Sequence, residues 1–394
     1  MLRHIAPAFA VVALVAALPG CKKTQAPEVA GNPGGTTQSA PAGDVIKIGE
    51  VGSMTGSQAT FGTSTHQGIE LAVKEQNEKG GIKGKKIQVI SLDDQGKPEE
   101  AATAVTKLIT QDKVNAILGE VASSVSLAMA PIAQQYKIPM ITPSSTNPKV
   151  TEQGDYIFRV CFIDPFQGTV MARFANENLK VKKVAILRDV KNDYSVGLAN
   201  YFTETFKKAG GEIVIDQSYS SGDIDFKSQL TAVRAKAPEA IFVPGYYTEV
   251  GLIARQAREL GIKAPLMGGD GWDSPKLTEI GGTAMNGNYF SNHYSAEDKA
   301  PQVQSFISAY KAAYGVIPDG LAAMGYDAAK VLFDAMNRAP SLESQAVRDA
   351  IAATKDYQAV TGKITINEKR DAVKSAVVLK VDGPDFKYQA TVNP

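Results

Sequence analysis

From Val45 onward, short apolar runs alternate with longer segments in which apolar residues recur at helical spacing. The loop Gly52–Thr63 leads into a helix that carries Ile69 and Val73, and Gly80-Gly81 closes it. Further strands and one helix are predicted by the same reasoning at Val45–Val51, Lys86–Leu92, Pro98–Gln111 and Asn115–Leu118. Consecutive strand–helix units are typical of an α/β fold, a parallel sheet with helices on both faces.

A second series begins near Asp164 and repeats this architecture, which predicts two similar lobes. Its helices are predicted at Phe166–Asn178, Val196–Ala209, Asp225–Lys236 and Thr248–Leu260, and its strands at Lys183–Arg188, Glu212–Asp216, Ala240–Val243 and Pro265–Gly268. A third part, from about Met285, mixes helices and strands and is too small for an independent lobe. We expect it to complete the sheets of both lobes.

The N-terminus is predicted to be a targeting segment. Arg3 and His4 precede an apolar run, Ile5–Leu18, whose length fits a signal peptide and is too short to span a bilayer. The sequence Leu-Pro-Gly-Cys that follows resembles a bacterial lipobox, so residues 1–20 are predicted to be a lipoprotein signal peptide and Cys21 the lipidated residue. The alternative is an ordinary signal peptide with an incidental cysteine. Residues 21–43 are rich in Pro, Gly, Ser and Thr and are predicted to form a flexible tether.

Composition narrows the classes of partner. The 394 residues suggest two or three domains. Lys plus Arg (42) nearly equals Asp plus Glu (41), which argues against nucleic acid and favours a small or specific ligand. The second cysteine, Cys161, has no partner for an internal disulfide and is expected to be a buried small hydrophobe.

The sequence contains few residues or motifs typical of an enzyme active site, and we predict a protein that is not an enzyme and needs no cofactor or metal. His66 and His293 are the only candidates for a histidine base outside the signal peptide. Asp93-Asp94 at a strand end is weak support for a Ca²⁺ site, and a loop-capping role is the better interpretation.

Two neighbouring strand ends in the first series carry hydroxyl side chains. Ser123 and Ser124 begin a predicted helix, and Ser144, Ser145 and Thr146 follow the next strand. Ligands of open α/β sheets bind beyond the strand carboxyl ends, and helix N-termini favour anions. The pattern predicts a pocket for a small carboxylate, with simple helix capping by the two serines as the alternative.

Two strand ends in the second series have the opposite chemistry. Tyr246 follows one strand, and Asp270 lies among glycines after the next. Asp270 can neutralise an ammonium and Tyr246 can accept a hydrogen bond from it, so the two lobes together suit an α-amino acid zwitterion. A turn or cap role for Asp270 is the alternative.

Several segments together resemble the periplasmic leucine/isoleucine/valine-binding proteins of type I, over nearly all of the chain from Val45 to about Val381. The segments are Ile46–Ser53, Asn77–Gly84, Gly119–Ser124, Thr142–Pro148, Gly245–Glu249 and Arg255–Gly261. The resemblance implies two Rossmann-like lobes joined by a three-crossing hinge, closing on an amino acid that an ABC permease then takes inward. Lobe I would hold residues 44–163 and 293–373, and lobe II residues 164–292 and 374–394.

The resemblance also implies roles for single residues. Ser123 and Thr146 would bind the ligand carboxylate, and Ser144 or Ser145 would offer a backbone carbonyl to the ammonium, alongside Tyr246 and Asp270. The side-chain walls would be Phe61, Tyr194 and Leu321. Asp270 stands where the best-known members have a glutamate, and Phe61 replaces a tyrosine-type wall, so the side-chain preference is left open.

These features predict an extracytoplasmic, lipid-anchored monomer that binds a branched-chain amino acid. Three alternatives stay open: a sensing receptor of the same fold, a binding protein for a short amide, urea or an aromatic acid, and an enzyme.

Overall fold

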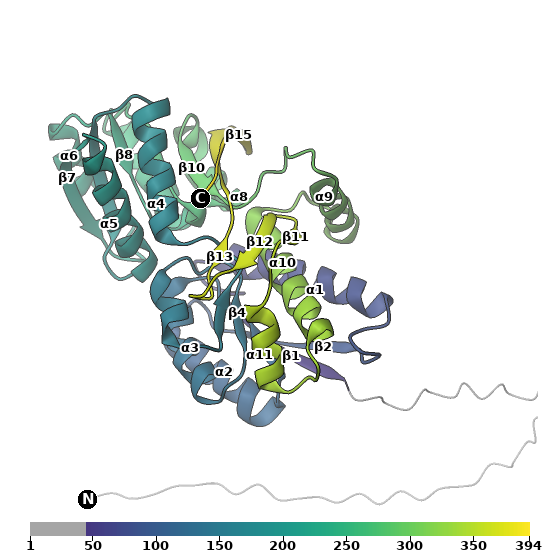
Figure 1. Ribbon diagram of the computed structural model, residues 1–394. Coiled ribbons are helices and arrows are strands. Elements are labelled where there is room, and N and C mark those ends of the chain that lie inside the picture. The colour runs from purple at the N-terminus through teal and green to yellow at the C-terminus, as the bar shows by residue number, and fades with distance from the viewer. Residues whose placement is uncertain (1–44) are drawn as a thin grey trace, which may run out of the picture. The chain divides into compact units, whose positions relative to one another are not determined.

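Two separate β-sheets organise the part of the chain that the computed structural model describes, residues 45–394 (Figure 1). The sheet of lobe I is entirely parallel, in the order β2-β1-β3-β4-β5. Its strands are β1 (Ile46–Gly52), β2 (Ile87–Asp93), β3 (Ala116–Leu118), β4 (Met140–Thr142) and β5 (Ile157–Arg159). All three residues of β3 are fully buried because helices cover both faces of such a sheet.

The sheet of lobe II has the order β15-β14-β10-β9-β8-β6-β7 and is parallel except where β14 pairs with β10 and β15. Its strands are β6 (Lys183–Asp189), β7 (Glu212–Tyr219), β8 (Ala240–Phe242), β9 (Leu266–Gly268), β10 (Tyr289–Asn292), β14 (Ala376–Asp382) and β15 (Asp385–Val392). A small third sheet joins β11 (Tyr357–Ala359), β12 (Gly362–Ile366) and β13 (Ala372–Val373). The fold belongs to the α/β class, as predicted.

Helices follow most strands in both lobes. In lobe I they are α1 (Ala59–Glu78), α2 (Pro98–Lys107), η1 (Leu108–Asp112), α3 (Ser123–Gln135), η2 (Pro148–Gln153), α9 (Pro301–Tyr314), α10 (Gly320–Arg338) and α11 (Ser344–Ala352). In lobe II they are α4 (Asp164–Arg173), η3 (Phe174–Asn178), α5 (Asp193–Lys208), α6 (Lys227–Ala235), α7 (Tyr247–Glu259), η4 (Asp270–Trp272), α8 (Pro275–Gly281) and η5 (Gly282–Met285).

The helices α1 and α10 approach each other closely through two glycines. A Cβ added to Gly68 would lie 2.0 Å from the carbonyl oxygen of Ala322, and one added to Gly325 would lie 2.4 Å from that of Thr65. Neither position accepts a side chain without moving a backbone. This contact sets the start of α10 against α1, and both helices contribute residues to the cleft described below.

The chain passes between the two large sheets three times. It leaves the first sheet after β5, returns to lobe I after β10, and crosses again between β13 and β14 (Figure 1). Residues 45–394 belong to one compact unit, so the lobes touch as well as being connected.

The structure corrects several predicted elements. The helix α1 begins at Ala59, inside the predicted loop, and α5 begins at Asp193, where the side chain of Asn192 accepts a hydrogen bond from the Tyr194 amide. The seven-residue helix α8 was not predicted, because it is shorter than two apolar repeats. No strand after Met285 joins the sheet of lobe I: β10, β14 and β15 extend that of lobe II, and β11–β13 stand apart.

The predictions for the two cysteines and the N-terminal segment have different outcomes. Cys161 is fully buried with a free thiol, as expected. The signal peptide, the tether and Cys21 lie outside the described residues. Within residues 45–394, no helix is both long enough and apolar enough to cross a membrane.

Candidate functional site

A small cleft lies between the lobes at the carboxyl ends of their strands. Its lining from lobe I is Phe61, Val121, Ser123, Ser144 and Leu321, and from lobe II Tyr194, Tyr246, Asp270 and Gly271. The space between these side chains measures about 20 Å³, which is room for about one water molecule. A ligand of amino-acid size therefore enters this cleft only when its walls move apart.

Polar contacts hold the lobes together around the cleft. The Ser124 hydroxyl donates to the carboxylate of Asp193 (3.1 Å) and accepts from the Asp193 amide (2.9 Å). On another side, the hydroxyls of Thr60 and Ser274 lie 2.9 Å apart. Thr60, Ser124 and Asp193 are partly exposed, whereas Ser274 is fully buried. Water can replace the partners of the exposed groups when the lobes separate, so these contacts cost little to break.

The end of the cleft in lobe I is suited to an anion. Ser123 opens α3, and its hydroxyl oxygen accepts from the Asn147 amide (3.2 Å), which leaves its own hydrogen to donate. The buried hydroxyl of Ser144 has no hydrogen-bond partner among residues 45–394. The helix N-terminus adds a partial positive charge. Neither Ser123 nor Ser124 caps the helix with its side chain, since the N-cap is Ala122.

Two acids near this end are buried, and burial raises the pKa of both. Burial raises the pKa of Asp164 to about 8, and burial together with the charge of Asp94 raises the pKa of Glu120 to about 8. The carboxyl of Glu120 is further held by Ser53 and by the Ala122 amide. Burial thus favours the uncharged form of both groups, which reduces their repulsion of an anion beside Ser123.

The end of the cleft in lobe II is suited to a cation. Asp270 is 6% exposed and is the only carboxylate in the lining. Its Oδ1 accepts from Nε2 of Gln167 (2.8 Å), and its Oδ2 lies 3.0 Å from Nε2 of His293. A carboxylate has about four acceptor sites, so two remain for a ligand.

His293 holds Asp270 as an uncharged donor. Burial lowers the pKa of His293 and outweighs the opposing effect of Asp270. Its ring stacks on Phe162, with centroids 3.7 Å apart. Since Asp270 can only accept, the hydrogen of the imidazole is on Nε2. Both rings belong to segments where the chain crosses between the lobes, so the crossings fix the position of the acid.

Aromatic rings form the apolar wall. Tyr194 and Tyr246 stack in parallel with centroids 5.4 Å apart, and Phe61 meets Tyr246 edge-on at 5.6 Å. The Tyr194 hydroxyl accepts from the Gly271 amide (3.2 Å), which ties the wall to the loop of Asp270. Leu321, 4% exposed, closes the wall from α10. These surfaces suit an uncharged side chain.

Of the nine predicted ligand residues, the structure brings seven to the cleft and leaves Ser145 and Thr146 behind it. Ser145 is fully buried: its hydroxyl contacts Ser126 and two backbone carbonyls, and its own carbonyl accepts from Arg159 and Cys161. The polar groups of Ser145 are therefore already paired within the protein, and a ligand contact by this residue stays a prediction. Thr146 is also fully buried, with its carbonyl 3.0 Å from the Asp164 amide, and its role stays a prediction.

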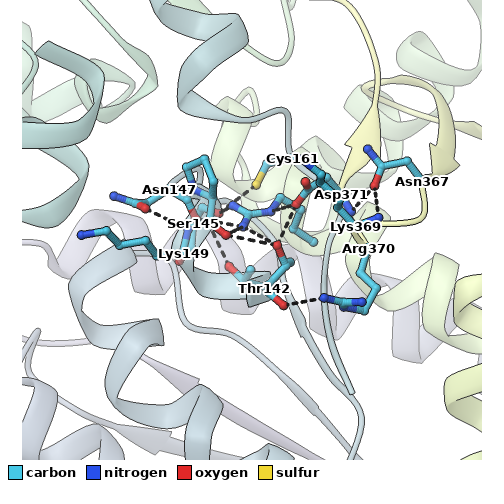
Figure 2. A network of polar contacts seen from close by, with 12 residues as sticks. Thr142, Ser145, Asn147, Lys149, Cys161, Asn367, Lys369, Arg370 and Asp371 are labelled. Atoms are coloured by element: carbon cyan, nitrogen blue, oxygen red, sulfur yellow. Dashed lines mark hydrogen bonds and ion pairs between the residues drawn. The ribbon is translucent and has the colours of Figure 1, made fainter. Parts of the chain in front are cut away.

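A buried arginine holds the loop that carries Ser144. Arg159 donates to the carbonyls of Ser145 and Asn147, to the hydroxyl of Thr151 and to the carboxylate of Asp371. Figure 2 shows this network around Ser145, Asn147 and Asp371.

Sequence reasoning missed Arg159 and Gln167, and it missed that His293 holds Asp270, since the partners of these residues lie far away in the chain. Asp93 has the predicted loop role, since its carboxylate accepts from the Met54, Thr55 and Gln95 amides.

The raised pKa of Asp164 predicts a pH-dependent stability. The folded protein keeps this proton up to about pH 8, whereas the unfolded chain loses it near its ordinary pKa of 3.8. The contribution of Asp164 is thus fully present below about pH 4 and is lost as the pH rises to about 8, at up to about 1.4 kcal/mol per pH unit. Asp164→Asn lacks this group, so the unfolding free energy of the wild type minus that of the variant, from urea titrations, should fall across this window. A difference independent of pH would contradict the assignment.

Two α/β lobes joined by three crossings and closing a polar and aromatic cleft define a two-lobed solute-binding protein. The chain belongs to the periplasmic binding protein family, whose sequence model matches residues 45–385.

Known relatives are similar over most of their length. The chain is 33% identical to the Leu/Ile/Val-binding protein homolog 3 of Brucella melitensis over 328 residues, covering 83% of this chain and 88% of the relative. Among solved structures, a leucine-binding protein LivK from Thermotoga maritima has a TM-score of 0.86 at 43% identity, over 89% of this chain and 99% of that one. The branched-chain amino acid transporter substrate-binding protein LivJ from Streptococcus pneumoniae, in complex with isoleucine, has a TM-score of 0.84 at 36% identity, over 89% and 100%.

Proposed function

We propose that this protein captures a branched-chain aliphatic amino acid between its lobes and delivers it to an ABC permease. The observation that carries the proposal is the arrangement of the cleft, with hydroxyls at a helix N-terminus in one lobe and a buried carboxylate in the other. The relatives named Leu/Ile/Val-binding, leucine-binding and isoleucine-bound support the choice of ligand.

In this proposal, Ser123 and the first turn of α3 bind the carboxylate, with Thr146 joining when the cleft adjusts. Asp270, Tyr246 and a carbonyl at Ser144 bind the ammonium. The aliphatic side chain packs against Phe61, Tyr194 and Leu321. The ligand stabilises the closed form because its two charged ends contact different lobes, and a ligand shifts this equilibrium only by its differential affinity for the two forms.

We further propose lobe boundaries at 44–163 with 293–373 and at 164–292 with 374–394. The strands of the two large sheets support the first part of each lobe and residues 374–394, and the close packing of α10 on α1 supports residues 293–373. Cys21 is proposed to carry a lipid anchor after removal of residues 1–20, with the folded part outside the cytoplasm as a monomer. The protein is proposed to release its ligand unchanged, and chromatography after prolonged incubation with leucine should recover leucine only.

Leucine, isoleucine and valine should raise the melting temperature of the purified protein by about 3 °C or more when present at about a hundred times Kd. Leucinamide, which lacks the carboxylate, and 4-methylpentanoic acid, which lacks the ammonium, should have little effect, because each leaves one charged end of the cleft unpaired. A thermal-shift screen against all amino acids, these two analogues, urea and benzoate checks this. A larger shift with an uncharged amide or with benzoate would contradict the proposal.

A further inference from the structure

A second and larger cavity opens on the flank of the protein. This flank pocket measures about 560 Å³, within the roughly 300–1,000 Å³ of typical small-molecule sites. Lobe I lines it with α1, α9 and the loop before α10, and lobe II lines it with the segment after η4 and the turn between β14 and β15. It shares no lining residue with the cleft around Asp270.

Four acids line this pocket, and the two least exposed of them, Asp273 and Asp319, belong to different lobes. Asp273 of lobe II is 2% exposed, and its Oδ2 accepts from the Gly320 amide (2.6 Å) and from Nδ2 of Asn292 (2.8 Å). Asp319 of lobe I caps α10 through the Ala322 amide (2.9 Å) and accepts from the Ser64 hydroxyl (2.6 Å). Burial raises the pKa of Asp319 to about 6, and burial together with the charge of Asp319 raises the pKa of Asp273 to about 7.

This acid pair has no cationic side chain as a partner among residues 45–394. None of the ion pairs found within residues 45–394 includes Asp273 or Asp319. The lysine in the lining, Lys387, is paired with Glu297 (3.5 Å) and Asp385 (3.2 Å). Near pH 7 the pair therefore carries negative charge that the protein leaves unbalanced, and a cation in the pocket would be stabilised.

The remaining lining favours an organic cation. Tyr294 is 5% exposed, and its buried hydroxyl has no hydrogen-bond partner in the described part of the chain. Tyr310 and Phe386 add aromatic surface, and Val316 and Ile317, 56% and 60% exposed, stand at the pocket. Aromatic rings attract organic cations, and apolar surface binds their hydrocarbon part. Residues 45–394 contain no cluster of three or more acid, histidine or cysteine side chains for a metal ion.

We propose that the flank pocket binds a small organic ammonium ion with an apolar body, its ammonium between Asp273 and Asp319 and hydrogen-bonded to Tyr294. The hydrocarbon part lies against Tyr310, Ile317 and Phe386. Since the two acids belong to different lobes, the bound cation bridges the lobes and favours the closed form. Its occupancy and that of the amino-acid cleft are then coupled, and each ligand raises the affinity of the other by the same factor.

Calorimetric titration with phenethylammonium chloride at pH 8 tests the binding. The wild type should bind it, and 2-phenylethanol, which has the same apolar body without the charge, should not bind. Asp319→Asn should weaken binding at least tenfold, and asparagine is a good helix cap, so α10 should form normally. Glu297→Gln removes an acid that Lys387 already pairs and should leave the affinity within about twofold.

Two further measurements distinguish binding in the flank pocket from binding in the amino-acid cleft. Asp270→Asn should bind phenethylammonium as the wild type does, and saturating leucine should not compete with it. Loss of binding in Asp270→Asn, or competition by leucine, would place the cation in the cleft and overturn the proposal. Absence of binding at millimolar phenethylammonium, or a stronger heat with calcium chloride that Asp319→Asn abolishes, would overturn it as well. The coupling between the two ligands rests on the proposed function, whereas the binding of the organic cation to the flank pocket does not.

Discussion

Asp270→Asn is expected to weaken the binding of leucine, isoleucine or valine at least about tenfold. The asparagine keeps the shape of the side chain and can still accept from Gln167, but it removes the only negative charge in the lining of the cleft. Charge-assisted hydrogen bonds in a desolvated site are worth about 1.5–3 kcal/mol, which corresponds to a factor of about ten to more than a hundred in Kd. Titration calorimetry measures the change.

Comparing leucine with its analogue 4-methylpentanoic acid tests the contact between Asp270 and the ligand ammonium directly. In the wild type, losing the ammonium from leucine should cost much of the affinity, and in Asp270→Asn the same loss should cost far less, because the partner is already gone. Glu249→Gln is the matched control: it changes a buried acid of lobe II that accepts from the Gly222 amide and does not line the cleft. Unchanged affinity in Asp270→Asn would remove the ammonium assignment.

Arg159→Met is expected to destabilise the protein by about 3–5 kcal/mol, since it leaves a buried carboxylate without its partner. Asp371 is 4% exposed and lies 2.7 Å from Nε of Arg159, and the carbonyls of Ser145 and Asn147 lose their donor too. Ligand affinity should also fall because the loop that carries Ser144 is no longer held. Urea unfolding measures the first effect and calorimetry the second.

Two variants control for this result. Arg188→Met breaks an ion pair with Asp216 whose side chains are 19% and 36% exposed, and it should cost about 1 kcal/mol or less. The double variant Arg159→Met with Asp371→Leu removes the stranded charge and should recover part of the lost stability. If Arg159→Met cost no more than Arg188→Met, the network would not support the loop.

The fold class and most elements were predictable because strong patterns carried them. The apolar runs of β1 and β6 and the periodicity of α7 are local signals that burial on one or two faces imposes. The helix α8 was missed because it is shorter than two apolar repeats. The strands β11 and β13 were missed because they are partly exposed, unlike the equally short but fully buried β3 and β8, and their place depends on distant partners.

The candidate site was predictable to a similar degree. Strand ends placed Ser123 and Ser144 at the carboxyl edge of one sheet and Tyr246 and Asp270 at that of the other, and all four line the cleft. The pattern could not separate Ser144 from Ser145, since only the fold decides which neighbour faces the cleft and which meets Arg159. Nor could it pair Asp270 with Gln167, which is 103 positions away.

The sequence alone determined most of the strands and helices and the kinds of side chain at the strand ends, because these follow from local spacing and side-chain type. Only the tertiary structure decided which of those groups meet. It stacked His293 on Phe162 behind Asp270, turned Ser145 into the core, and brought Asp273 and Asp319 from different lobes to one pocket. The reason is that contacts between residues far apart in the chain depend on the packing of whole elements, which no local pattern encodes.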